Sequence, residues 1–485
     1  MPTRPNILLI FTDQQRHDTI GALGNRVIQT PAMDSLCREG VAFTSAYTPS
    51  PVCVAARCSL LLGQWAHQTG CDSNNPMPQD QTSLMDLLQD AGYQTHGTGK
   101  MHFVPDSEKL WGFDGRDYSE ECTTQDSFAA HLREHGYDHI VDPQGVRSEY
   151  YYLPQPSQLP ARLHNSTWVA DRSLNFLQTR DRDRPFFLWS SFIKPHPPFE
   201  SPVPWNRLYK PMEMPLPHLP TGYEELLTFW NREQNRYKWR DQGTDMNLLR
   251  TMRAAYYAAI SFVDSNAGRL LAYLRETGEL DDTLVLWTAD HGEMLGDYGS
   301  YGKRTMLDAA HCIPLLARYP KAFGAGERCD RLASLVDVMP TCLELAGLPV
   351  PQSAVGENLA TVAGGGSQRE AVLSQFDGGA MGLYSLIRDD YKYVYSAPDQ
   401  REWLFDRRRR PEERSLVDGA VKARMRSELI GWLRRDGHTE PLEGDGWKAF
   451  PRREVPSDPD AGLLFQEGAR VEDWFPEGYR PRCNP

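Results

Sequence analysis

The stretch that most constrains this chain is Tyr47–Gln64, which reads YTPSPVCVAARCSLLLGQ. Its first part is rich in proline and polar residues and favours a loop, whereas the segment from Ser59 onward is apolar and helix-forming. Cys53 therefore lies at a predicted loop-to-helix junction, with Arg57 one turn further along the same helix face. The free N–H groups and positive dipole end of a helix N-terminus suit an anionic tetrahedral group such as sulfate or phosphate.

The residues at this junction resemble a known signature. Cys53-Val54-Ala55-Ala56-Arg57, followed by CSLLLGQ, is similar to the motif of the formylglycine-dependent sulfatases of the alkaline phosphatase superfamily. The resemblance implies that a maturation enzyme oxidises Cys53 to formylglycine, an aldehyde whose hydrate is the nucleophile. The commoner family form has proline where this chain has Ala55. By itself the pentapeptide is equally compatible with a buried structural thiol, and that interpretation is kept for Cys58.

Two predicted strands end in acidic residues. Asn6 to Phe11 is an apolar run typical of a strand buried in a parallel sheet, and it is followed by Asp13. Leu284 to Thr288 is a second such run, followed by Asp290. Because ligands bind beyond the carboxyl ends of strands in open α/β sheets, both carboxylates are placed for a metal. The alternative for Asp13 is a helix N-cap.

The resemblance completes this predicted metal site. It implies that Asp13, Gln14, Asp290 and His291 bind one divalent cation, with Ca²⁺ first and Mn²⁺ or Mg²⁺ next. The family usually carries two adjacent aspartates where this chain has Asp13-Gln14. A glutamine oxygen can bind a hard cation but brings no charge, which leaves the metal affinity and identity open.

Four basic side chains match further family motifs. The resemblance implies that Lys100 in GKMHF and Lys303 in GKR bind sulfate oxygens together with Arg57. It also implies that His102 contacts the hydrated aldehyde and that His196, in KPHPPF, faces the leaving-group oxygen. The structural alternatives are a packed loop histidine for His196 and a surface lysine for Lys303.

Three more residues are candidates for substrate binding. Asn74 and Asn75 lie in a polar loop after the Cys53 helix. In the sulfatases this loop can face substrate, although asparagines in a turn need no further explanation. Arg304, next to Lys303, is the third candidate.

The overall composition limits the kinds of partner. The chain has 485 residues, 24% of them charged, and a net charge of −13, which argues against nucleic-acid binding. A local cluster of lysine, arginine, histidine and metal can still bind an anionic substrate. The nine scattered cysteines favour a reduced compartment over a disulfide framework. No apolar run is long enough for a signal peptide or a membrane span, so we expect a cytoplasmic protein without membrane contact.

The order of predicted elements gives the fold class. We expect an α/β domain over 1–350, with a large, mostly parallel mixed sheet sandwiched by helices as in alkaline phosphatase. We expect a smaller α+β unit over 367–440, an antiparallel sheet plus a helix, and a tail over 441–485 that wraps the surface or joins a homo-oligomer. Within the large domain, 106–160 is predicted as an insertion, 202–246 as a long polar loop, and Gly40–Tyr47 as one strand.

These features together predict hydrolysis of sulfate monoesters. The substrate class that the resemblance favours is a sulfated carbohydrate, because GKMHF resembles choline sulfatases and bacterial carbohydrate sulfatases. The main alternative is a phosphonate monoester hydrolase or phosphodiesterase of the same superfamily, which Asp13-Gln14 and Asp290-His291 suggest. Another alternative is a choline or aryl sulfatase, and a third is a non-catalytic anion-binding relative.

Overall fold

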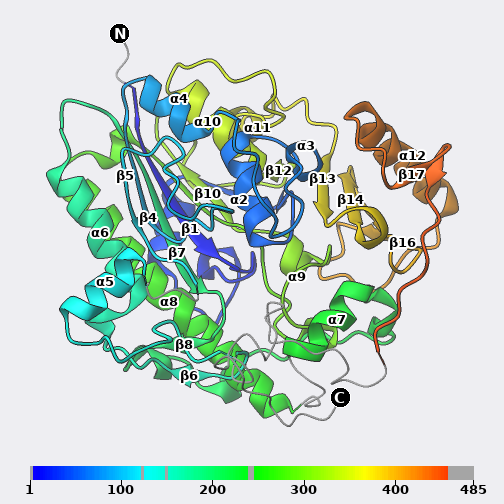
Figure 1. Ribbon diagram of the computed structural model, residues 1–485, viewed down its shortest axis with the longest axis horizontal. Helices are drawn as coiled ribbons and strands as arrows, with labels where there is room; N and C mark the ends of the chain where they lie inside the picture. The colour runs from blue at the N-terminus through cyan, green and yellow to red at the C-terminus, as the bar shows by residue number, and fades with distance from the viewer. Residues whose placement is uncertain (1–3, 122–124, 148–150, 239–244, 457–485) are drawn as a thin grey trace, which may run out of the picture.

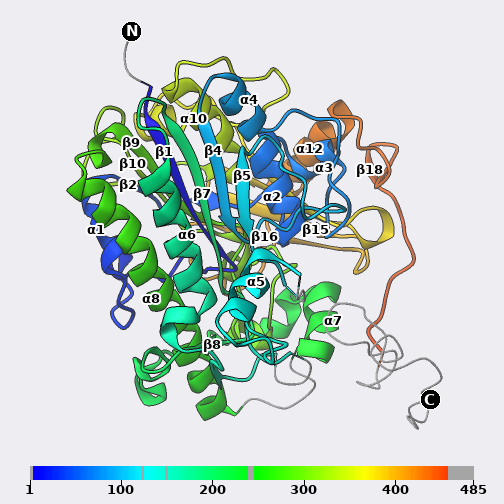
Figure 2. The same cartoon turned by 60° about the vertical axis from the view of Figure 1, so that its left-hand side comes forward.

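A mixed sheet of eight strands organises the chain (Figures 1 and 2). The computed structural model describes residues 4–121, 125–147, 151–238 and 245–456. Across the sheet the order is β11 (Glu327–Cys329), β2 (Val41–Phe43), β10 (Leu315–Arg318), β9 (Thr283–Ala289), β1 (Asn6–Asp13), β7 (Phe186–Pro195), β4 (Gln94–Gly99) and β5 (Gly115–Tyr118). All neighbouring strands pair in parallel except β10, which is antiparallel to β9 and to β2. The predicted mostly parallel sheet is confirmed.

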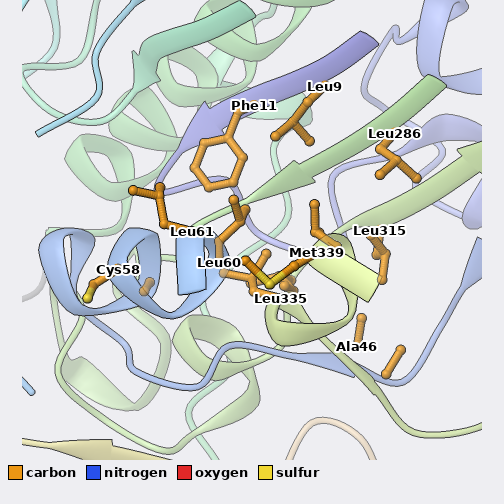
Figure 3. Close-up of a cluster of buried hydrophobic side chains, with 14 of the residues drawn as sticks. Leu9, Phe11, Ala46, Cys58, Leu60, Leu61, Leu286, Leu315, Leu335 and Met339 are labelled. Atoms are coloured by element: carbon orange, nitrogen blue, oxygen red, sulfur yellow. The ribbon is translucent and has the colours of Figure 1, made fainter. Parts of the chain in front are cut away.

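The strand β1 lies at the centre of this sheet and is buried on both faces. Its side chains alternate between two hydrophobic clusters, with Leu9 and Phe11 in one and Leu8 and Ile10 in the other. Figure 3 shows the first cluster, in which strand residues pack against Leu60 of the helix that begins at Cys53. A strand that buries both faces needs apolar residues throughout, which explains the continuous apolar run in the sequence.

Helices cover both faces of the sheet (Figure 2). One layer holds α1 (Pro31–Glu39), α6 (Asn165–Thr179) and α8 (Met246–Glu276). The other layer holds α2 (Cys53–Leu62), α4 (Leu84–Asp90) and α10 (Val338–Leu345). The remaining short helices are α3 (Ala66–Thr69), α5 (Ser127–Glu134), α7 (Phe229–Lys238), α9 (Asp308–His311) and α11 (Leu359–Ala363). This three-layer arrangement matches the predicted sandwich.

A separate antiparallel sheet follows toward the C-terminus (Figure 1). It runs in order through β13 (Val372–Phe376), β14 (Leu383–Arg388), β15 (Tyr391–Ser396) and β16 (Arg401–Asp406), and α12 (Gly419–Arg435) packs on it. Three two-stranded ladders complete the structure: β3 (Ala46–Tyr47) with β12 (Ala333–Ser334), β6 (Gln155–Pro156) with β8 (Glu200–Ser201), and β17 (Leu442–Glu443) with β18 (Gly446–Trp447). The predicted α+β unit is confirmed, while most of the predicted tail, residues 457–485, lies outside the described residues.

A buried ion-pair network joins the two sheets. Lys392 of β15 lies with its Nζ 2.7 Å from Oδ1 of Asp308, the first residue of α9, and it also pairs with Glu412. Arg410 binds the second oxygen of Asp308 at 3.1 Å. Two cations and two anions therefore compensate one another and connect β15 of the smaller sheet with α9.

Three predictions about individual elements need correction. The predicted strand Gly40–Tyr47 is divided between β2 and β3, which belong to different sheets. The region 106–160 is not only an insertion, because β5 forms an edge of the large sheet. The predicted loop 202–246 contains α7. The buried side chains of this helix include Asn231 and Gln234, so its sequence lacks the apolar periodicity that would have indicated a helix.

The seven cysteines within the described ranges are all free, whereas Cys122 and Cys483 lie outside those ranges. In the same part of the chain, no helix has both the length and the apolar character needed to cross a membrane.

Candidate active site

The two carboxylates predicted at strand ends meet in the structure. Asp13 ends β1 and Asp290 directly follows β9, the neighbouring parallel strand. Arg57 lies between them, with Nε 3.1 Å from Asp290 Oδ2 and a terminal nitrogen 3.1 Å from Asp13 Oδ2. Its other terminal nitrogen donates to the carbonyl of Lys100 at 2.6 Å. The guanidinium is thus engaged by protein groups and fixes one oxygen of each buried carboxylate.

Cys53 begins α2, which places its thiol beside this carboxylate pair. Its Sγ lies 2.8 Å from Lys303 Nζ, 3.3 Å from His291 Nε2 and 3.7 Å from Asp13 Oδ1. Burial raises the pKa of the thiol, but the ammonium groups of Lys303 and Lys100 hold that pKa well below its ordinary value. Such an electropositive environment is typical of a reactive cysteine and not of an inert structural one.

The residues present fit a divalent cation. Ligand atoms of four buried residues lie within 4.8 Å of one another, and these residues are Asp13, Cys53, Asp290 and His291. His291 donates its Nδ1 proton to the carbonyl of Gly292 at 3.0 Å, which directs Nε2 to the side of the ring that faces Cys53 and the carboxylates. Burial and the neighbouring Asp13 raise the pKa of Asp290, so a cation would stabilise both carboxylates. Carboxylate oxygens with one imidazole suit a cation such as Ca²⁺, Mg²⁺ or Mn²⁺.

Gln14 connects this cluster to the lysine side of the site. Its backbone N–H donates to Asp290 Oδ1 at 2.9 Å, and its side-chain oxygen accepts from Lys303 Nζ at 3.0 Å. Its side-chain nitrogen donates to Tyr152 and to Glu293. The backbone of Gln14 has φ 67°, an unusual value for a residue other than glycine. Because the amide oxygen is bound to Lys303 here, the role of Gln14 as a metal ligand stays a prediction.

Lys100 reaches the same cluster from the end of β4. Its Nζ lies 2.7 Å from Asp13 Oδ2 and also pairs with the carboxylate of Glu121. The other oxygen of Glu121 lies 2.5 Å from a guanidinium nitrogen of Arg147. Burial raises the pKa of Glu121, but His196 and Lys100 hold that pKa well below its ordinary value. The structure therefore holds a charged carboxylate beside the lysine that is predicted to bind sulfate.

The two predicted histidines contact different members of this group. His196 donates from Nδ1 to the carbonyl of Pro197 at 2.7 Å, so its Nε2 is directed to Glu121, 3.6 Å away. Burial lowers the pKa of His196, and Glu121 opposes that shift. His102 contacts Cys53: burial and Lys100 oppose its protonation, but the hydrogen bond with the thiol raises the pKa of His102 above its ordinary value.

The three predicted substrate-binding residues differ in their placement. Asn74 accepts from the backbone N–H of Val54 at 3.3 Å, next to Cys53. Asn75 bonds within its own turn, with the N–H of Ser73 and the carbonyl of Gly70. Arg304 binds the hydroxyl of Tyr237 on α7 at 2.7 Å. The structure brings Asn74 and Arg304 to the rim of the site, whereas the hydrogen bonds described for Asn75 are those of a turn.

Three further residues contact the predicted site: Glu121 and Gln234, which sequence reasoning missed, and Tyr152, which belongs to a run of three tyrosines (150–152) whose sequence is compatible with sugar binding or with packing. Glu121 binds Lys100, Tyr152 binds Gln14 and Glu293, and Gln234 binds the backbone of Lys303. All three come from the regions predicted as an insertion or a loop, where no periodicity indicates which side chains are buried. Glu293 accepts the N–H groups of Leu295 and Gly302 and so caps the turn that follows it.

Comparisons with known proteins support this arrangement. The family model described as Sulfatase matches residues 5–348, which is most of the chain. A second model, described as N-sulphoglucosamine sulphohydrolase, C-terminal, matches residues 296–434 and covers the smaller sheet. The first match contains all the predicted catalytic and metal-binding residues.

Individual relatives agree over nearly the whole length. An arylsulfatase of Clostridium perfringens is 29% identical over 89% of this chain and 93% of its own. An N-acetylglucosamine-6-O-sulfatase of Bacteroides thetaiotaomicron is 26% identical over 89% of this chain and 86% of its own. The crystal structure of a phosphonate monoester hydrolase of Agrobacterium radiobacter superposes with a TM-score of 0.78 at 25% identity, covering 93% of this chain and 100% of that one. With a family model that matches well over half of its residues, this chain belongs to the sulfatase family of sulfuric ester hydrolases.

Proposed function

We infer that this chain hydrolyses sulfate monoesters of carbohydrates. The observation that carries this inference is the convergence of two distant lysines on position 53. Lys303 Nζ lies 2.8 Å from Cys53 Sγ, and Lys100 Nζ lies 2.7 Å from Asp13 Oδ2, beside the same thiol. Preorganised ammonium groups stabilise charge on sulfate oxygens in a buried site. The similarity to an N-acetylglucosamine-6-O-sulfatase supports a sugar substrate.

Two groups would add the chemistry that unmodified side chains lack. Converting Cys53 to formylglycine would supply a hydrated aldehyde, with one hydroxyl to attack sulfur and a second that lets sulfate leave. A divalent cation held by Asp13, Asp290 and His291, with Gln14 near them, would lower the cost of ionising that hydroxyl and would polarise the sulfate. The structure shows four of these five side chains fully buried and Cys53 1% exposed, so the chemistry would take place away from bulk water.

The chain itself supplies the proton transfers. His196 directs Nε2 into the site, so its imidazolium form, which Glu121 favours, can donate the Nε2 proton to the leaving oxygen as the S–O bond breaks. His102 contacts the side chain at position 53 and is placed to take a proton from it when sulfate leaves. Arg57 would act by holding the two carboxylates in position, since its nitrogen atoms are bound to them and to Lys100.

Peptide mass analysis would test the nucleophile directly. Conversion of a thiol to an aldehyde lowers the mass of the Cys53 peptide by about 18 Da, a covalent change that a non-catalytic relative does not need. The protein should be produced together with a formylglycine-generating enzyme, and Cys58 in the same peptide should stay unmodified. An active enzyme whose Cys53 peptide keeps the full thiol mass would contradict this nucleophile.

Hydrolysis of phosphonate monoesters is the second candidate activity. The structural similarity to a phosphonate monoester hydrolase favours it, and so does the neutral Gln14 at the carboxylate pair. Rates should be compared on 4-nitrophenyl sulfate, a 6-sulfated N-acetylglucosamine and a phenylphosphonate ester. A higher kcat/KM on the phosphonate than on both sulfates would reverse our choice.

The kind and number of metal ions bound at this site can be tested separately. We propose one hard divalent cation per chain, with Ca²⁺ first and Mn²⁺ or Mg²⁺ next, because the donor atoms are carboxylate oxygens and an imidazole nitrogen. Elemental analysis should find one such ion. Two zinc ions per chain would contradict the site, since they would indicate a dimetal centre like that of a phosphatase.

A further inference from the structure

The helix α7 (Phe229–Lys238) holds the loop that carries Lys303. Three carboxamides on one face of this helix bond to the segment 299–303. Asn231 donates to the hydroxyl of Ser300 at 2.9 Å. Asn235 donates to the carbonyl of Gly299 at 2.8 Å and accepts the N–H of Tyr301 at 3.1 Å.

The third carboxamide, Gln234, binds Lys303 itself. Its side-chain oxygen accepts the backbone N–H of Lys303 at 3.2 Å, and its side-chain nitrogen donates to the backbone carbonyl of the same residue. Gln234 is fully buried, so water does not replace these bonds. One side chain therefore satisfies both backbone polar groups of a lysine that is predicted to act in catalysis.

The neighbouring backbone groups are bonded as well. The N–H of Gly302 donates to Glu293, and its carbonyl accepts from Met294. The N–H of Arg304 donates to the carbonyl of Pro51 at 3.0 Å, two residues before Cys53. The loop is thus tied to the nucleophile segment on one side and to α7 on the other.

The backbone around Lys303 has a strained conformation that depends on these hydrogen bonds. Gly302 has φ +89°, and a Cβ on it would lie 2.7 Å from Cε of Lys238 and 2.8 Å from Oε1 of Gln234. Arg304 has φ 65°, which is costly for a residue that is not glycine. A strained backbone persists only where its surroundings enforce it, and Gln234 supplies that constraint at the residue between them.

We propose that Gln234 is a positioning residue that sets the place of the Lys303 ammonium relative to position 53. The proposal rests on the proposed function only in that Lys303 assists the departure of the leaving group. Lysine has a long flexible side chain, so its Nζ can stay 2.8 Å from Sγ and 3.0 Å from Gln14 only if its backbone is fixed. Displacement of a catalytic group by about 1 Å can lower a rate on the order of 10²-fold.

The test compares four variants with the wild type and with Lys303→Ala, all bearing formylglycine, on two sulfate esters. Gln234→Met keeps the length of the side chain and removes both hydrogen bonds, and Gln234→Glu keeps the shape but cannot donate to the carbonyl. Asn231→Ala is the matched control, because it removes a buried carboxamide from the same helix face without contact to Lys303. The fourth is the double variant Gln234→Met with Lys303→Ala. Thermal unfolding of each variant shows which of them are folded.

We expect Gln234→Met and Gln234→Glu to lower kcat on an alkyl or sugar sulfate by about 10- to 100-fold. On 4-nitrophenyl sulfate the loss should be several times smaller, because nitrophenolate needs little help to leave. The double variant should be no slower than Lys303→Ala alone. A structural defect that only lowers the amount of active enzyme would slow both esters equally and would add to the Lys303→Ala effect.

The outcomes distinguish the role of Gln234 from the proposed function. Equal losses on both esters, losses matched by Asn231→Ala, or additive losses in the double variant would overturn the role of Gln234. If the wild type prefers phenylphosphonate esters, the proposed function is wrong and the same comparison on esters with good and poor leaving groups still tests Gln234. Absence of turnover of both ester classes by the wild type would contradict the proposed function and the inference with it.

Discussion

The two halves of the site are built in different ways. The sheet-borne half comprises Asp13, Asp290, Cys53 and Arg57, which lie on β1, directly after β9, and on α2. The loop-borne half comprises Glu121 and Lys303, which lie on segments between the core elements, whereas His196 directly follows β7 as Asp290 follows β9. The first is positioned by the register of adjacent strands and by a hydrophobic core, and the second by hydrogen bonds from side chains to loop backbone.

This difference has consequences for the effect of mutations. Core packing and buried ion pairs are cooperative, so a change in the sheet-borne half should abolish activity or destabilise the fold. Hydrogen bonds to a loop contribute about 1 kcal/mol each, so a change in the loop-borne half should alter rates while the protein stays folded. The predictions below test this division.

The largest effect is expected for Cys53→Ala. The variant loses the group that becomes the nucleophile, and loss of a covalent nucleophile lowers kcat on the order of 10⁶-fold in enzymes that depend on one. The matched control is Cys58→Ala, five positions along the same helix and equally buried. Initial rates on 4-nitrophenyl sulfate should show a nearly inactive Cys53→Ala and a Cys58→Ala that retains most of its activity. Comparable losses in both variants would indicate that the effect is structural.

Arg57→Ala should destabilise the whole protein. It leaves the buried carboxylates of Asp13 and Asp290 without their shared partner, which costs about 3–5 kcal/mol of unfolding free energy. Urea unfolding measures this loss. In Arg269→Ala, which breaks an exposed pair with Asp171, the loss should stay below about 1 kcal/mol. A fully stable Arg57→Ala would show that Lys100, together with a bound cation, suffices to hold the two carboxylates.

Most of the sheet-borne half could be predicted from the sequence. Apolar runs that end in an acidic residue indicate both a buried strand and the edge at which its last side chain lies. Asp13 and Asp290 were therefore expected to meet. A helix was expected to begin at Cys53, with Arg57 one turn further along it. These inferences need only local periodicity and the rule that parallel strands end at one edge.

The partners of the loop-borne half could not be predicted in this way. Glu121 and Gln234 lie in polar segments, where neither periodicity nor composition distinguishes a buried side chain from an exposed one. Their contacts join residues 21 and 69 positions apart. The protein contacts of Arg57 could not be predicted either: its nitrogens bind the carboxylates and a carbonyl, while its role in binding sulfate stays a prediction.

Lys303→Ala should lower kcat with little effect on stability. The ammonium group lies beside position 53, and removal of one preorganised donor lowers kcat on the order of 10²–10³-fold. The loss should exceed the rise in KM, because charge shifts onto the leaving oxygen only as the S–O bond breaks. It should be greater on sugar sulfates than on 4-nitrophenyl sulfate. Near-full activity of Lys303→Ala beside an inactive Lys100→Ala would place Lys303 outside the reaction.

The smallest effect is expected for Glu121→Gln. The carboxylate of Glu121 pairs with Lys100 and with Arg147, so an anionic ester that approaches Lys100 must compete with it. Removing this charge should lower KM by only about 5-fold, which corresponds to about 1 kcal/mol, because Lys100 keeps its second carboxylate partner, Asp13. Steady-state kinetics on 4-nitrophenyl sulfate measures the change. Glu108→Gln, in the same inserted region but bound to Tyr118 at the surface, should leave KM unchanged.

The kcat of Glu121→Gln distinguishes two roles for this carboxylate. Glu121 also lies 3.6 Å from Nε2 of His196, where its charge favours the protonated imidazole that must donate to the leaving oxygen. The neutral amide of the Glu121→Gln variant would not give that support, so kcat should fall by a factor similar to KM and leave kcat/KM nearly unchanged. If KM falls alone, Glu121 only competes with substrate for Lys100. If KM rises instead, the carboxylate binds the substrate itself, and the loop-borne half then contributes to substrate binding as well as to the rate.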